Sequence, residues 1–185
     1  MEIKNKFYSK NVVYKPWGHE YVVYNNANKI AVTFVYIKFG HKTSLHCHPQ
    51  KKTGFIILDG KALVQVGIYK ENKKNYKAGS RLVLRPGLFH SLEAVSKKGL
   101  CALEFETPYK KNDLLRFKDK YGRKLSNYEG KKYTKKISEL GLVKFKKPKI
   151  GKINKYLFNN FEVSICVIKK MNKIIKKDNK STSAY

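Results

Sequence analysis

The chain has 185 residues, of which 42% are hydrophobic, and this is enough for one domain with a buried core plus an appendage. Its 41 Lys and Arg against 13 Asp and Glu give a formal net charge of +28, which favours anionic partners. The three cysteines do not have the spacing of a disulfide framework, and no apolar run approaches the roughly 20 residues of a membrane helix, so a cytoplasmic protein without membrane spans is expected.

A basic chain with many aromatic residues raises the question of nucleic acid. The 13 Tyr and 10 Phe lie mostly in strand-like runs, where packing in a core explains them. No recognisable RNA- or DNA-binding module is present. Nucleic acid is therefore not the expected partner, and the charge indicates anionic partners only in general.

The first forty residues predict strands. Residues 1–10 are polar and are interpreted as a loose arm or an edge strand, and residues 19–24 as a strand. After a turn at 25–28, residues 29–39 predict a long strand. Both of its alternating sets of side chains are largely apolar, so it is expected to be buried on both faces.

Short strands with turns between them continue to residue 106. Residues 55–58 and 61–69 flank Asp59-Gly60, which predicts a β-hairpin because glycine accepts the positive φ of a type I′ turn. Further strands are expected at 81–84, 90–95 and 100–106. This pattern is typical of an antiparallel sandwich or small barrel with a pocket in its mouth.

The remainder of the chain predicts smaller elements. A short helix is expected to start at Asn112 or Asp113 and end at Gly122, with its apolar side chains facing the barrel: Leu114, Leu115 and Phe117. A helical turn is expected at 137–142, and a hairpin from strands 156–158 and 161–168. The predicted organisation is a β-barrel domain at 1–130, an extension at 131–168 and a basic, disordered tail at 169–185.

Three histidines form the strongest chemical signal. His46 and His48 are separated by one residue, so on an extended segment they project to the same face while Cys47 points away. An isolated pair of this kind is more often an ordinary part of a solvated strand. The segment from Gly79 to His90, a strand entering a tight turn, delivers a third histidine and favours a shared metal site.

Four motifs occur in an order that resembles a known family: KPWG (15–18), SLHCH (44–48), HSLE (90–93) and DLLRFKDKYGR (113–123). They are similar to the cupin module of type II mannose-6-phosphate isomerases, which is also the C-terminal part of bifunctional mannose-1-phosphate guanylyltransferases. The likeness covers residues 14–123. It implies an all-β, jelly-roll-like antiparallel cupin barrel with a short C-terminal helical and hairpin extension, and by analogy a homodimer.

The resemblance also implies a metal set. The family's Gln, His, Glu and His ligands fall on His46, His48, Thr53 and His90. A threonine hydroxyl is a poor ligand for a divalent ion, but three imidazoles can still hold one, with Zn²⁺ as the first expectation. Gln50 or a nearby carboxylate can complete the shell. The alternative is a metal-free cupin whose histidines act as acids, bases or pocket lining.

Further site residues are candidates for proton transfer and for substrate binding. Glu104 and Glu106 alternate on one strand face and, with His41, are the candidate catalytic residues, although a solvated outer face explains the two glutamates equally well. The candidate phosphate-binding residues are Lys51, Arg85, Arg116 and Arg123, of which Lys51 stands where the family has Arg. For each of them, an ordinary surface cation is the alternative.

Three functions compete at this point. The leading hypothesis is a metal-assisted isomerase of a phosphorylated sugar, serving nucleotide-sugar or surface-polysaccharide synthesis, with mannose 6-phosphate as the simplest substrate. The absence of Glu at position 53 motivates a metal-free epimerase or ketoisomerase of a nucleotide-sugar. It also motivates a non-catalytic cupin that binds a sugar phosphate.

Overall fold

The computed structural model describes residues 2–123, 133–158 and 161–167. It divides into two compact units, Met1–Leu142 and Val143–Tyr185. Within the described part of the chain, no helix has the length and apolar character needed to cross a lipid bilayer.

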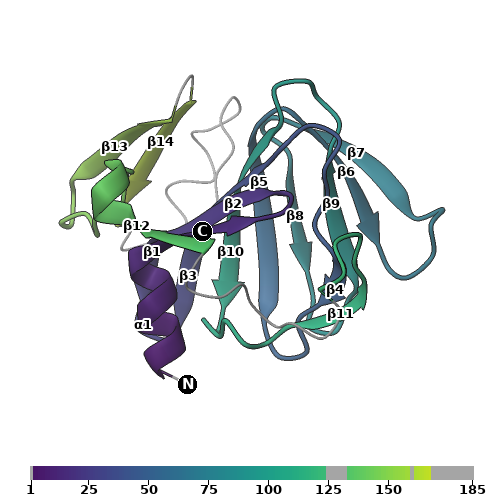
Figure 1. Ribbon diagram of the computed structural model, residues 1–185. Coiled ribbons are helices and arrows are strands. Elements are labelled where there is room, and N and C mark those ends of the chain that lie inside the picture. The colour runs from purple at the N-terminus through teal and green to yellow at the C-terminus, as the bar shows by residue number, and fades with distance from the viewer. Residues whose placement is uncertain (1, 124–132, 159–160, 168–185) are drawn as a thin grey trace. The chain divides into compact units, whose positions relative to one another are not determined.

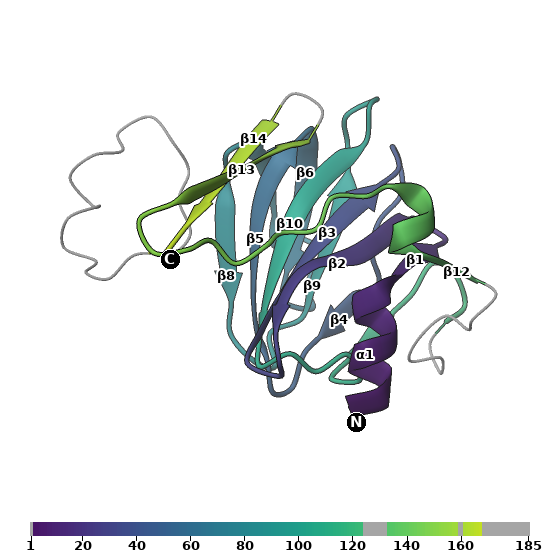
Figure 2. The ribbon, with the colours of Figure 1, turned by 90° about the vertical axis from the view of Figure 1, so that its left-hand side faces the viewer.

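The first unit consists of two antiparallel β-sheets facing one another (Figure 1). The seven-stranded sheet has the order β12-β1-β2-β3-β10-β5-β8, and Figure 2 shows β2, β3, β10, β5 and β8 side by side. Its strands are β12 (Thr134–Lys136), β1 (Asn11–Lys15), β2 (Gly18–Asn26), β3 (Ile30–Ile37), β10 (Leu100–Thr107), β5 (Lys52–Asp59) and β8 (Arg81–Leu84). The five-stranded sheet contains β11 (Leu115–Lys118), β4 (Leu45–Cys47), β9 (His90–Ala94), β6 (Lys61–Val66) and β7 (Lys73–Lys77). The predicted cupin architecture is confirmed.

Side chains from the two inner faces form the core. It includes Trp17, Val35, Ile37, Phe55, Ile57, Ala62, Val64, Leu84, Leu92, Ala94, Leu100 and Ala102. Because strand side chains alternate between faces, Leu100 and Ala102 on β10 share their inner face with Glu104 and Glu106. One face of β10 therefore passes from apolar core to polar pocket along its length.

The turn at Asp59-Gly60 exists, but the predicted hairpin is wrong. Gly60 has φ 83°, and its N–H donates to the Asp59 carboxylate at 2.7 Å. The strands on either side belong to different sheets: β5 pairs with β10 and β8, whereas β6 pairs with β7 and β9. This turn carries the chain from one sheet to the other.

Gly60 makes a close approach that glycine alone tolerates. A Cβ atom there would lie 2.2 Å from the Gly99 carbonyl oxygen and 2.6 Å from Ser96 Oγ, whereas at Gly40, with φ 71°, it would meet nothing within 4 Å. Both positions carry the left-handed backbone cost of about 1–2 kcal/mol for an L-residue. We expect Gly60→Ala to lower the free energy of unfolding by at least about 2 kcal/mol more than Gly40→Ala, because a clash with backbone is added. Urea denaturation of both variants measures this difference, and equal losses would contradict it.

Residues 2–10 form a helix rather than the expected arm or edge strand. Helix α1 (Glu2–Lys10) buries Tyr8, which is 5% exposed, and lies beside β1 and β2 (Figures 1 and 2). The Asn11 side-chain amide donates to the Phe7 carbonyl at 2.7 Å, satisfying one of the carbonyls left open at the helix end. Burial of the Tyr8 side chain and the Asn11 cap stabilise the helix, although most residues of this segment are polar.

The helix expected to start at Asn112 or Asp113 is absent. In its place β11 pairs antiparallel with β4, matching Leu115 to Cys47 and Arg116 to His46. Two of the side chains expected to face the barrel are exposed, Leu115 at 54% and Phe117 at 44%. Pairing with the edge of β4 overrides the local helical pattern.

Two of the C-terminal predictions, the helical turn and the hairpin, are confirmed. The helical turn is η2 (Ile137–Leu140), which, like β12, belongs to the first unit although it lies beyond residue 130. In the second unit, β13 (Ile153–Phe158) and β14 (Phe161–Cys166) form the antiparallel hairpin, with Phe145 packed against Tyr156 at a ring-centroid distance of 4.7 Å. The tail at 169–185 lies outside the described residues.

Candidate metal centre and its pocket

The three predicted histidines meet at one point between the sheets. His46 on β4 is the direct antiparallel partner of His90 on β9, and His48 follows two residues after His46 on the same side. One ring nitrogen from each of the three lies within 4.8 Å of the others, and the ring centroids are 4.5 to 5.5 Å apart. Cys47 is buried on the opposite side of the strand.

Backbone carbonyls fix the tautomer of all three imidazoles. The Nδ1 atoms hydrogen-bond to the carbonyl oxygens of Ser44 at 2.7 Å (from His46), Asp113 at 2.6 Å (from His48) and Leu88 at 3.0 Å (from His90). Because a carbonyl can only accept, each neutral ring carries its proton on Nδ1 and leaves the Nε2 lone pair available. The Nε2 atoms of His48 and His90 are buried, and no described group hydrogen-bonds to them. This is the arrangement of metal-ligating histidines.

Burial keeps these imidazoles neutral. It lowers the pKa of His48 to about 3 and that of His90 to about 4, in both cases with a contribution from the positive charge of Lys51. Burial, together with the neighbouring His90 and His48, lowers the pKa of His46 well below its usual range. At neutral pH all three rings are therefore neutral, with no proton on Nε2, as metal binding requires. Three neutral imidazoles suit Zn²⁺ and other first-row divalent ions.

The position of the missing family ligand is buried but holds no carboxylate. Thr53, 1% exposed, lies on β5 opposite Glu106, and no described group hydrogen-bonds to its Oγ1. Gln50 is exposed, and its side chain hydrogen-bonds with Lys110. The carboxylate nearest the triad in the described interactions is Glu104, whose Oε1 lies 4.0 Å from His48 Nε2.

Glu104 and Glu106 both point into the pocket, so the solvated outer face is excluded. Glu106 is 2% exposed and is bound by Lys51 at Oε1 and by Lys111 at Oε2, the latter at 2.9 Å. Burial alone would raise the pKa of Glu106, but the two ammonium groups outweigh it and hold the carboxyl well below its usual range. Burial, with the charge of Glu106, raises the pKa of Glu104 to about 8. The two glutamates therefore have different protonation behaviour.

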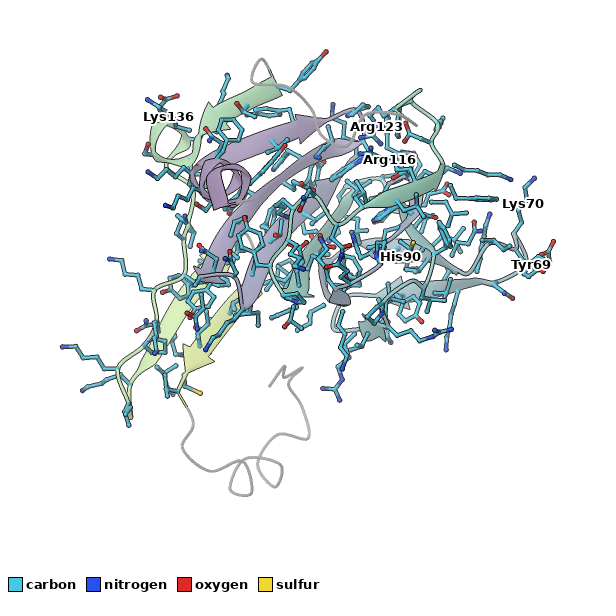
Figure 3. All side chains as sticks on the ribbon, turned by 90° about the horizontal axis from the view of Figure 1, so that it is seen from below. Tyr69, Lys70, His90, Arg116, Arg123 and Lys136 are labelled. Carbon is cyan, nitrogen blue, oxygen red and sulfur yellow. The ribbon has the colours of Figure 1, made fainter. Side chains whose placement is uncertain are left out.

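Two of the predicted arginines form part of the pocket wall. Arg116, on β11, lies opposite His46 in register, and its Nη1 donates to the Arg123 carbonyl oxygen at 3.3 Å. Arg123 pairs with Asp119 at 2.7 Å and stacks on Tyr121 with its guanidinium carbon 5.1 Å from the ring centroid. Figure 3 shows the two arginines beside one another.

Two predicted site residues lie elsewhere. The ring of His41 stacks on Tyr121 with an interplanar angle of 7°, and its Nδ1 is 3.0 Å from the Phe39 carbonyl oxygen. Arg85 is an exposed residue just after β8. Neither lines the pocket of the triad.

Three charged residues of the pocket were not predicted: Lys15, Glu20 and Lys111. Lys15 and Glu20 form an ion pair at 3.4 Å on β1 and β2. Glu20 is a charged residue in a strand of mostly apolar residues. That contrast was the sequence signal that could have identified it as a pocket residue. Lys111 lies in a polar run, Lys110 to Asp113, which contains no such contrast.

The complete pocket has an empty volume of about 660 Å³, including the space at its open mouth. Besides the three glutamates, three lysines and two arginines named above, it is lined by Trp17, Val35, Thr43, Ser44, His46, His48, Phe55, Leu92 and Leu114. Paired charges and an apolar floor suit a small, polyhydroxylated ligand with an anionic group.

Comparisons with known proteins agree with this geometry. The family model described as mannose-6-phosphate isomerase C-terminal matches residues 3–119. The fold is similar to that of an oxalate decarboxylase from Lactobacillus farciminis solved as a formate complex, with a TM-score of 0.51 and 20% identity over 57% of this chain and 33% of that one. This chain thus spans about a third of that enzyme.

Two further solved structures resemble it more loosely. A double-stranded β-helix protein from Klebsiella pneumoniae has a TM-score of 0.48 and 19% identity, covering 54% of this chain and 79% of that one. KdgF from a Halomonas species has a TM-score of 0.46 and 17% identity, covering 52% and 84%. A search of curated proteins gave no match. With a family model spanning more than half of the chain and the histidine centre in place, the protein belongs to the mannose-6-phosphate isomerase C-terminal family of cupins.

Proposed function

We propose that the pocket binds one divalent metal ion, Zn²⁺ being the first expectation, and interconverts the aldose and ketose forms of a phosphorylated sugar. The simplest pair is mannose 6-phosphate and fructose 6-phosphate. The observation that carries the proposal is the convergence of three Nε2 lone pairs, each fixed by an Nδ1 hydrogen bond, beside a carboxyl group and two arginines. The family match supports the substrate class.

Aldose–ketose isomerisation moves a proton between C1 and C2 and places negative charge on the adjacent oxygens. Glu104 is assigned the proton transfer, because a carboxyl with a pKa of about 8 can both release and accept a proton near neutral pH. Glu106 is unsuited to this role, since two lysines hold it ionised. A metal held by His46, His48 and His90 would supply Lewis-acid stabilisation of the sugar oxygens.

The cations divide between two tasks. Arg116 and Arg123 present planar guanidinium groups at the wall and are assigned the substrate phosphate. Lys51 is 2% exposed, bound to Glu106 and close enough to the triad to influence its charge. We therefore assign it a hydroxyl or carbonyl oxygen of the sugar rather than the phosphate.

Arg116→Ala tests the phosphate assignment. We expect it to raise KM for a sugar phosphate at least about tenfold with a smaller change in kcat, because a charge-assisted hydrogen bond to phosphate contributes roughly 1.5–3 kcal/mol. Arg85→Ala, an equal loss of charge outside the pocket, should change KM less than about twofold. Steady-state kinetics of both variants decide the question, and equal effects would remove the assignment.

The activity itself is tested with metal-stripped protein reloaded with Zn²⁺, Co²⁺ or Mn²⁺. A coupled assay should detect turnover of mannose 6-phosphate or another sugar phosphate by the loaded protein, and none by the stripped protein. Absence of turnover with every metal and a panel of hexose and pentose phosphates would refute the isomerase proposal.

A non-catalytic sugar-phosphate-binding role is the second candidate, and Thr53 favours it. Where the family has a ligating carboxylate, this chain buries a hydroxyl without a described partner. In that case sugar phosphates should raise the melting temperature and be recovered unchanged from the same reaction mixtures.

A further inference from the structure

The segment 113–123, here called the strap, connects the two halves of the proposed site. It carries both wall arginines, Arg116 and Arg123, and its strand β11 pairs with the histidine strand β4. Its first residue, Asp113, is 8% exposed and packs against the turn that follows the histidines. The strap therefore touches the metal ligands at one end and presents the anion-binding groups along its length.

Asp113 makes four hydrogen bonds across this junction. Its carboxylate accepts the backbone N–H of Lys51 at 2.9 Å and that of Gln50 at 3.0 Å, with a second Gln50 contact at 3.2 Å. Its carbonyl oxygen accepts the Nδ1–H of His48 at 2.6 Å. One residue therefore fixes a metal ligand and the turn that delivers Lys51.

These contacts have a consequence for metal binding. The Nδ1 bond orients the His48 ring and sets the tautomer that exposes Nε2, and loss of such outer contacts typically weakens metal affinity about 10–100-fold. The Asp113 carboxylate anchors the Pro49–Lys51 turn. This anchoring holds the Asp113 carbonyl oxygen at hydrogen-bond distance from His48 Nδ1. A shift of the strap is thus also a shift of the partner of His48.

We propose that Asp113 is a positioning residue that couples metal binding at the three histidines to anion binding at Arg116 and Arg123. An anion that fixes the strap also fixes the carbonyl that orients His48. Because coupling between two sites is reciprocal, bound metal strengthens anion binding by the same factor. The inference rests on the proposed metal site but does not require that the protein be an isomerase.

Calorimetric titration of metal-stripped protein with Co²⁺, with and without saturating sulfate as the anion probe, tests the coupling. For the unaltered protein we expect sulfate to tighten Co²⁺ binding about fivefold or more. Asp113→Asn keeps the shape of the side chain but replaces one carboxylate oxygen with an NH₂ group. That group cannot accept a hydrogen bond from the backbone N–H of Gln50 or Lys51. The variant should weaken Co²⁺ binding about 10–100-fold and remove the sulfate effect.

A matched control and a second readout separate positioning from general damage. Asp59 also accepts a backbone N–H, from Gly60, but in the described part of the chain it hydrogen-bonds to no histidine of the triad and to no residue of the strap. Asp59→Asn should therefore leave both the Co²⁺ affinity and the sulfate effect within about twofold. At saturating Co²⁺, Asp113→Asn should also shift the visible d–d absorption bands, because the geometry of the bound ion depends on the orientation of His48. Melting temperatures establish that both variants are folded.

Sulfate without effect on Co²⁺ binding to the unaltered protein overturns the coupling, whatever the assay for isomerase activity gives. Retention of affinity, sulfate effect and spectrum by Asp113→Asn overturns the role of Asp113. Failure of the isomerase assay with the coupling intact would leave this inference standing and remove only the proposed reaction.

Discussion

Replacing His90 with alanine should leave the purified protein with almost no bound divalent metal. His90 supplies one of three imidazoles whose nitrogens lie within 4.8 Å of one another, and two neutral imidazoles make a weak site. Changes outside the ligand shell alone weaken metal affinity about 10–100-fold, so loss of a ligand should exceed about 100-fold. Elemental analysis should show close to one metal per chain before the substitution and less than about one tenth after it.

The His90→Ala variant should lose turnover of the sugar phosphate together with the bound metal. Lewis-acid stabilisation is worth several kcal/mol, and each 1.4 kcal/mol is about tenfold in rate, so His90→Ala should reduce kcat/KM for the sugar phosphate about 10³-fold. Adding excess Zn²⁺ should restore only a small part of this loss.

His41→Ala is the control for this experiment. It removes an imidazole that stacks on Tyr121 and is not one of the three whose nitrogens converge, so metal content and kcat/KM should change less than about threefold. Equal metal content in the His90 and His41 variants, both folded by circular dichroism, would show that the triad does not hold the ion.

The site was predictable from sequence where chemistry follows the strand period. His46 and His48 share a face because side chains alternate, and the short strand at 90–94 brings a third ring to the same level as the direct partner of His46. The same alternation put Glu104 and Glu106 together. The alternation did not show whether the two glutamates face the inside or the outside of the barrel. That depends on which sheet contains β10 and which face of that sheet is buried.

Long-range pairing limited the other predictions. Asp59-Gly60 specifies where the chain reverses, but the partners of β5 are β8 and β10, and β10 comes more than 40 residues later. The helix expected from Asn112 failed for a similar reason: the exposed edge of β4 offers backbone partners, and Asp113 uses its carboxylate on Gln50 and Lys51 rather than as a helix cap. Local sequence describes turns and alternation, whereas closure of the barrel decides the pairing.

The buried network around Glu106 is the feature that sequence reasoning missed most completely. Glu106 was predicted as a proton-transfer residue and Lys51 as a phosphate ligand, yet they bind one another, and Lys111 and Thr33 join them. Lys51, Glu106 and Lys111 are each less than 5% exposed. Charges taken out of water at this depth are stable only as a set, so removal of one member alone should strongly destabilise the fold.

Glu106→Gln should therefore lower the free energy of unfolding of the metal-free protein by about 3–5 kcal/mol at neutral pH, because it removes the carboxylate that binds two buried ammonium groups. The control is Glu162→Gln, which breaks a pair with Lys155 at 3.0 Å whose side chains are 63% and 51% exposed. Exposed pairs contribute about 1 kcal/mol or less, so urea denaturation should show a small change there.

A triple replacement separates loss of the counter-charge from loss of the side chain. Glu106→Met combined with Lys51→Met and Lys111→Met removes every charge of the network and keeps similar volume, and such exchanges of buried ion pairs for apolar groups are often neutral or stabilising. We expect it to recover at least half of the stability that Glu106→Gln loses. A loss below about 1 kcal/mol for Glu106→Gln would mean that other groups compensate the charges of Lys51 and Lys111. No recovery in the triple variant would mean that lost side-chain contacts, rather than the lost counter-charge, cause the destabilisation.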